Sequence, residues 1–148
     1  MRIIDCFMYF DEDLVLEIRL NTLNKIVNKF VICEATRDHA GNKKELKFDI
    51  NKFSEFREKI NYLVVDDIPV KVKPLKKNWH ENHTRDQFQR NALEREIKNF
   101  NPEDLIMISD IDEIPDPNKI KEFNIENKYA CFLQKNFQSK MNLLNTTD

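Results

Sequence analysis

The sequence predicts an α/β fold in which helices flank a largely parallel sheet. Apolar segments of strand length alternate along the chain with segments of helical periodicity, and one strand segment is continuously apolar, as strands buried on both faces are. The chain shows no internal repeat or interdomain linker, and 148 residues with 41% apolar side chains can bury a core of their own. We therefore expect residues 1–148 to form a single domain.

The first part of the chain alternates strand and helix. Residues 2–10 (RIIDCFMYF) and 29–34 (KFVICE) are predicted strands. Residues 12–28 are a predicted helix, because Leu16 and Leu20 begin an apolar series at helical spacing. Further along we expect a polar loop at 35–48, a short helix at 52–60 and a strand at 61–66.

A second long helix follows a basic, proline-containing connection. Thr84 and Gln87 fit a capping box at its start, and Asn101-Pro102 ends it. Its apolar face is formed by Phe88, Ala92, Leu93, Ile97 and Phe100. The remaining expected elements are a strand at 105–108, a helical turn at 117–123 and a strand at 129–137.

Charge and hydropathy exclude several classes of function. The net charge of -2, from 24 basic and 26 acidic residues, gives no electrostatic case for a nucleic-acid partner. No apolar run approaches the roughly 20 residues that span a bilayer. The N-terminus is acidic within five residues and lacks a small-residue cleavage site, so we expect no signal peptide and a cytoplasmic location.

The cysteines and the single glycine limit the kinds of site that the chain can form. Cys6, Cys33 and Cys131 are odd in number and each lies in an apolar stretch, so we expect buried, reduced thiols. Gly41 is the only glycine, which excludes a Walker loop and a dinucleotide fingerprint because both need several glycines.

An acidic cluster, Asp110, Asp112, Glu113 and Asp116, follows the strand at 105–108. Ligands of open parallel sheets bind beyond the carboxyl ends of the strands. Residues i and i+2 of an extended segment point the same way, so Asp110 and Asp112 can converge on Mg²⁺ or Mn²⁺, whose other ligands would be water and phosphate oxygens. The other interpretation is a solvated acidic turn. We interpret Glu113 as a group that supports the metal ligands and Asp116 as a surface charge.

Three further charged residues have two interpretations each. Arg90 borders the apolar face of its helix, where its stem can cover the core or its planar head can reach an anion at the strand ends. Glu34 and Arg37 follow the strand at 29–34 and so lie at the same edge of the sheet. They are either solvated loop charges or ligand-binding groups at that edge.

Several of these stretches together resemble the N-terminal part of the catalytic domain of glycosyltransferase family 17. The similar segments are the opening DCF, the LEIRL helix, FVICEAT with its polar continuation, WHENHTRDQFQRNAL and SDIDEIPD. They occur in order through nearly all of the chain. The resemblance implies a GT-A type nucleotide-sugar-binding fold.

The resemblance also implies roles for the residues. Asp110 and Asp112 would hold Mn²⁺, or Mg²⁺, and the donor diphosphate, with Arg90 beside the donor. Glu34 would lie near the nucleoside, and Arg37, at the same edge, would also bind the donor. The implied reaction is a metal-dependent, inverting transfer of a sugar, N-acetylglucosamine, from a UDP-sugar to a glycan acceptor.

This chain departs from the family in length. Family members are longer, so the acceptor-binding part and the general base would lie beyond Asp148, and the open edge could drive homo-oligomer formation. The alternative function is a non-catalytic remnant or interaction domain that keeps the nucleotide-sugar fold, and a third is metal-dependent phosphoester hydrolysis. The Lys-, Asn- and Ile-rich composition indicates a microbial or viral source.

Overall fold

A computed structural model of the chain describes residues 1–77, 80–135, 137 and 144. The chain divides into two compact units, Met1–Asp112 and Glu113–Asp148. None of the helices in the described part of the chain has the length and apolar character needed to cross a membrane.

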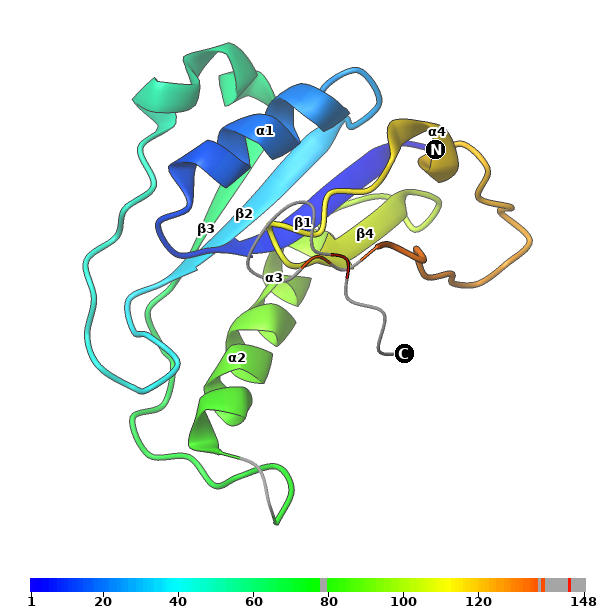
Figure 1. Ribbon diagram of the computed structural model, residues 1–148. Helices are drawn as coiled ribbons and strands as arrows, with labels where there is room; N and C mark the ends of the chain where they lie inside the picture. The colour runs from blue at the N-terminus through cyan, green and yellow to red at the C-terminus, as the bar shows by residue number, and fades with distance from the viewer. Residues whose placement is uncertain (78–79, 136, 138–143, 145–148) are drawn as a thin grey trace. The chain divides into compact units, whose positions relative to one another are not determined.

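The first unit is built on a four-stranded sheet in the order β3-β2-β1-β4, and every neighbouring pair of strands is parallel (Figure 1). This confirms the predicted α/β class. The strands are β1 (Ile3–Tyr9), β2 (Lys29–Ala35), β3 (Ile60–Val65) and β4 (Leu105–Ser109). The connecting helices are α1 (Asp13–Leu23), the 3₁₀ helix η1 (Ile50–Lys59), α2 (Glu81–Ala92) and α3 (Glu94–Ile97).

The two faces of the sheet have different partners. On one face a buried cluster joins the strands to α2, and its members are Ile4, Cys6, Val31, Cys33, Ala35, Val65, Ile68, Ala92 and Leu93. Phe88, Ile97 and Phe100 pack against this cluster as predicted, but the single helix predicted to end at Asn101-Pro102 is divided into α2 and α3, and Phe100 lies beyond both. Alternate residues of β1 point to the other face, where Arg19 of α1 lies over the ring of Phe7.

The first helix is shorter than predicted. It ends at Leu23 rather than at residue 28, although Val27 is still buried. The chain has already turned by Asn28, which makes two hydrogen bonds to Ile3 at the start of β1. The Asn28 N–H donates to the Ile3 carbonyl at 2.8 Å, and the Ile3 N–H donates to Asn28 Oδ1 at 2.8 Å. The apolar spacing continues through this turn because Val27 belongs to the core, and that is why the pattern overstated the helix.

The predicted capping box is wrong. Helix α2 begins at Glu81 with His80 as its N-cap residue, and no side chain caps it. Thr84 lies inside the helix, and its hydroxyl donates a hydrogen bond to the carbonyl of Lys73 at 3.0 Å. A tertiary contact therefore uses the group that the local pattern assigned to the cap.

The second unit contains α4 (Pro117–Ile120), which agrees with the helical turn predicted at 117–123 but is shorter. The strand predicted at 129–137 is wrong over residues 129–135, which have no regular structure, while residue 136 lies outside the described residues. The apolar side chains of Tyr129 and Leu133 are exposed, so no buried face supports a strand there. Cys131 is exposed too, contrary to the expected burial, whereas Cys6 and Cys33 are buried as predicted.

Candidate functional site

The candidate site lies at the carboxyl edge of the sheet. The register places Tyr9 of β1 opposite Glu34 of β2, and Phe7 of β1 opposite Ser109 of β4. The segments that follow β1, β2 and β4 therefore leave the sheet at one edge, which is where ligands bind in open parallel sheets. Asp110 is the first residue after β4 and stands at this edge.

The structure brings Asp110 and Arg90 together. The Arg90 Nη2 donates to Asp110 Oδ1 at 2.8 Å, and it lies 3.8 Å from Asp86 Oδ1 on the same helix. Both partners keep solvent access, with 35% of the Arg90 side chain and 50% of the Asp110 side chain exposed. The head of Arg90 therefore reaches the end of β4, where it pairs with a carboxylate of the protein, and its predicted contact with a bound anion stays a prediction.

The rest of the acidic cluster is not a continuation of the strand. The chain turns at residues 111–112, so the alternation expected of an extended segment stops after Asp110. Ile111 is buried and Asp112 is exposed. In the second unit Glu113 is exposed, and exposed Asp116 accepts a hydrogen bond from the Asn118 N–H at 2.8 Å as the N-cap of α4.

Glu34 is fully buried, and protein donors surround its carboxylate. Those donors are the Lys44 ammonium, the Lys47 and Phe48 backbone N–H groups at 2.8 and 3.1 Å, and the Tyr62 hydroxyl at 2.8 Å. Burial, together with the hydrogen bond to Glu34, raises the pKa of Tyr62 above its ordinary value. In this structure Glu34 fastens the loop at residues 44–48 to the sheet.

The conformation of the loop after β2 requires a glycine at position 41. Gly41 has a φ of 94°, and a Cβ added there would lie 3.0 Å from Arg85 Cζ. Arg85 of α2 is buried and donates to the carbonyls of His39 and Val70 at 3.1 and 2.7 Å. The predicted site residue Arg37 also serves this loop, since its Nη1 donates to the Gly41 carbonyl at 3.0 Å.

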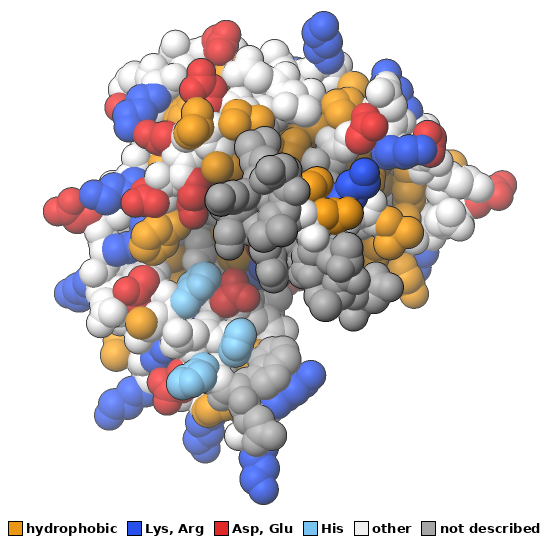
Figure 2. Space-filling model, viewed as in Figure 1, with side chains coloured by type: hydrophobic (Ala, Val, Ile, Leu, Met, Phe, Trp, Pro, Cys, Tyr) orange, Lys and Arg blue, Asp and Glu red, His pale blue; other side chains and the backbone are white. Residues whose placement is uncertain are grey.

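Polar residues of α2 that were not predicted from the sequence contact β2 and the loop after it, at the carboxyl edge of the sheet. Gln89 is buried, donates to the Cys33 carbonyl at 3.1 Å and lies 3.2 Å from His39 Nε2. His39 Nε2 is also 3.9 Å from Asp86 Oδ1. Figure 2 shows the histidine side chains close together on one face. The signal available in the sequence was the TRDQFQR run, whose polar residues recur at helical spacing.

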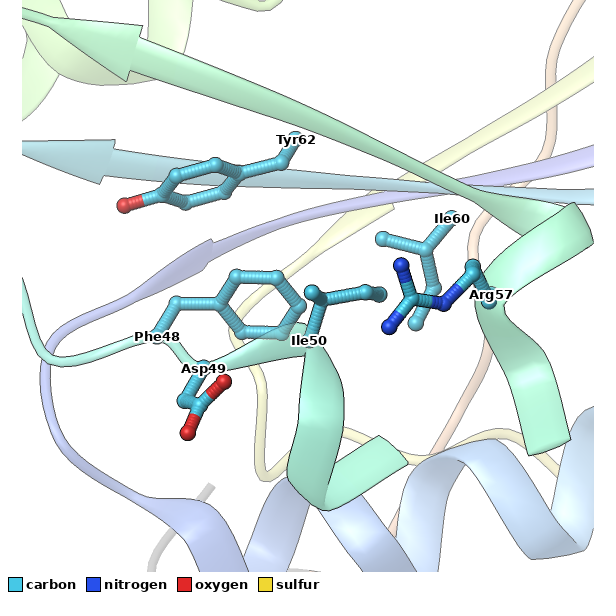
Figure 3. A pocket seen from close by; sticks show the side chains of 6 residues that line it. All are labelled: Phe48, Asp49, Ile50, Arg57, Ile60 and Tyr62. Carbon is cyan, nitrogen blue, oxygen red and sulfur yellow. The ribbon is translucent and has the colours of Figure 1, made fainter. Parts of the chain in front are cut away.

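Two of the cavities lined by described residues of the first unit bear on the candidate site and its surroundings. One, of about 500 Å³, is lined by Leu75, Lys76, His83, Asp86, Gln87 and Arg90. It shares Arg90 with the Asp110 contact and therefore adjoins the candidate site. The other, of about 430 Å³, lies along the edge strand β3 between Phe48, Asp49, Ile50, Arg57, Ile60 and Tyr62 (Figure 3).

An all-parallel α/β sheet with acidic and basic groups at its carboxyl edge is consistent with a nucleotide-sugar-binding fold. The profile of Glycosyltransferase family 17 matches residues 1–142 of this chain. The chain belongs to that family, which confirms the resemblance of its motifs.

Individual relatives agree with the family assignment. The chain is 28% identical over 119 residues to the human β-1,4-mannosyl-glycoprotein 4-β-N-acetylglucosaminyltransferase, and 28% and 27% identical to those of rat and mouse. Each match covers 77% of this chain and 22% of the relative, so the chain matches only a small part of these proteins. No solved structure matches.

Proposed function

We propose that this chain forms the donor-binding part of a metal-dependent, inverting glycosyltransferase that moves N-acetylglucosamine from a UDP-sugar to a glycan acceptor. The observation that carries the proposal is the ion pair between Asp110, at the end of β4, and Arg90, beside a cavity of about 500 Å³. The choice of sugar rests on the names of the mammalian relatives. The metal and the stereochemistry rest on the resemblance to the family.

The residues at the end of β4 fit a hard divalent cation. Within the described part of the chain no three His, Cys, Asp or Glu side chains form a ready-made metal site. Mg²⁺ and Mn²⁺ do not require one, because they bind to one or two carboxylates and take their other ligands from phosphates and water. Asp110 and Asp112 supply oxygen ligands with access to solvent, and they are the residues that would hold the ion.

The chemistry of the transfer assigns a task to each group. A metal bound here would stabilise the negative charge that grows on the leaving diphosphate. Arg90 would orient the same diphosphate, because its planar guanidinium can donate two parallel hydrogen bonds to phosphate oxygens. Inversion also needs a base that takes the proton of the acceptor hydroxyl. We assign no base among the described residues.

Calorimetric titration of UDP-GlcNAc with and without Mn²⁺ tests the proposal. We expect Mn²⁺-dependent binding by the wild type and its loss in Asp112→Ala. Glu103→Ala is the matched control, because Glu103 is an exposed carboxylate at the opposite, amino end of β4. Binding that is independent of Mn²⁺, or that survives in Asp112→Ala, would contradict the metal site. Binding without transfer or hydrolysis would favour the non-catalytic alternative.

A further inference from the structure

Arg19 is a fully buried arginine that the proposed function does not yet use. It lies on α1, and none of its side chain is exposed. Its Nε and Nη2 donate to the two carboxylate oxygens of Asp5, each at 2.8 Å, and Asp5 is equally buried within β1. The guanidinium also lies 4.6 Å from the centre of the Phe7 ring. A buried charge of this kind is costly unless its partners are well placed.

Other contacts of Arg19 lead to the acidic segment. Its Nη1 donates to the backbone carbonyls of Asp110 and Ile111 at 2.8 and 3.0 Å, and its Nη2 donates to Ser109 Oγ at 2.7 Å. These acceptors are the last residue of β4 and the first two residues beyond it. One side chain therefore links β1, α1 and the segment that begins with Asp110.

The stability of the core does not by itself explain this arrangement. An apolar pair of similar volume often stabilises a core as well as a buried ion pair does. What an apolar pair cannot do is donate hydrogen bonds to two successive carbonyls where the chain leaves the sheet. Those carbonyls turn inward to Arg19, while the carboxylate of Asp110 turns to Arg90 of α2.

We propose that Arg19, held by Asp5, is a positioning residue that fixes the backbone of Asp110 and Ile111 so that the carboxylates of Asp110 and Asp112 can bind a divalent cation together. This inference rests on the proposed function, because it names a further determinant of the same site. Arg19 does not touch the cation or the donor; it acts through the backbone of the residue that does. Lysine cannot replace it, because the guanidinium donates at least five hydrogen bonds here, to both oxygens of Asp5, to two carbonyls and to Ser109 Oγ, whereas an ammonium has three donors.

The test compares Arg19→Lys and Arg19→Met with Leu23→Ala. Leu23 lies one turn further along the same helix and is fully buried, so its truncation destabilises the core without touching the acidic segment. Mn²⁺ affinity is measured in the presence of UDP by the electron paramagnetic resonance signal of the free ion, below the onset of unfolding of every variant. Ser109→Ala, which removes a single contact of Arg19, serves if the Arg19 variants do not fold.

We expect both Arg19 variants to bind Mn²⁺ about tenfold or more weakly, the usual effect of losing a group that orients a metal ligand. Leu23→Ala should retain wild-type affinity, and Ser109→Ala should show a smaller loss. Hydrogen exchange of the metal-free protein should quicken at residues 109–112 in the Arg19 variants and not in Leu23→Ala.

Two different results would count against the proposals. Wild-type Mn²⁺ binding with unchanged affinity in the Arg19 variants, or in Ser109→Ala if only that variant folds, would overturn the role of Arg19 alone. Absence of Mn²⁺ binding by the folded wild type would overturn the proposed function, and the metal-positioning role of Arg19 with it.

Discussion

Replacing Glu34 with alanine separates two roles for this residue: contact with a donor, and attachment of the loop at residues 44–48. Glu34 is fully buried, and its partner Lys44 keeps only 12% of its side chain exposed. Glu34→Ala leaves that ammonium without its carboxylate and removes the acceptor of two backbone N–H groups and of the Tyr62 hydroxyl.

The expected loss is large. Removing one partner of a buried ion pair costs about 3–5 kcal/mol, because the other charge stays behind. Water that reaches Lys44 and the freed N–H groups would keep the loss near the lower value. Since domains are stable by only about 5–15 kcal/mol, the change in the free energy of unfolding is easily measured.

Urea unfolding, followed by circular dichroism, measures the change. Glu45→Ala is the matched control, because Glu45 lies in the same loop with 90% of its side chain exposed, and its 3.8 Å pair with Lys47 contributes little. We expect the control to stay within about 0.5 kcal/mol of the wild type. The reasoning fails if Glu34→Ala stays as close to the wild type as the control while losing donor affinity, because the carboxylate would then serve the ligand rather than the loop.

Two further predictions concern titration and thiol reactivity. Hydrogen bonding to Arg2 lowers the pKa of Asp104 to about 2, so the contribution of Asp104 to stability is present above the ordinary aspartate pKa of about 4 and is lost as the pH falls towards 2. The difference in melting temperature between the wild type and Asp104→Asn should therefore shrink between about pH 4 and about pH 2. A difference that does not vary with pH would contradict the pairing with Arg2. Burial raises the pKa values of the Cys6 and Cys33 thiols to about 12, whereas Cys131 is exposed. Ellman's reagent should therefore titrate one thiol per native chain and three in denaturant. Rapid reaction of three thiols in the native protein would refute the burial of Cys6 and Cys33.

Local sequence patterns predicted most of the first unit because its strands are apolar runs that the sheet buries. The strand at 29–34 is the clearest case, since β2 lies between two neighbours and is buried on both faces. The same reasoning failed at 129–137, where an apolar run is not buried and forms no strand over 129–135. A run of apolar residues is compatible with a strand, but a neighbouring strand and a buried face decide whether one forms.

The candidate site was predictable where it depends on position along the chain. Asp110 follows a parallel strand, so its place at the carboxyl edge could be expected. The pairing of Arg90 with Asp110, and the roles of Arg19 and Gln89, depend on how helices cross the sheet. A lone arginine in LEIRL resembles an ordinary helix residue, and nothing local shows that its partners lie 14 and about 90 positions away.

The place of β4 in the sheet also bears on how the site comes into being during synthesis. β1 is made first, but its pairing with β4 joins residues about a hundred positions apart, such as Ile3 and Leu105. Contacts this distant in sequence close late, because the intervening chain must first be ordered. A nascent chain that has formed β1, α1, β2 and β3 still has an open edge on β1, and Arg19 then has Asp5 and Phe7 of β1 beside it but not the carbonyls of Asp110 and Ile111. Docking of the last strand closes that edge and places Asp110, so a partly folded chain that lacks this strand also lacks the acidic segment beside Arg19 and Arg90.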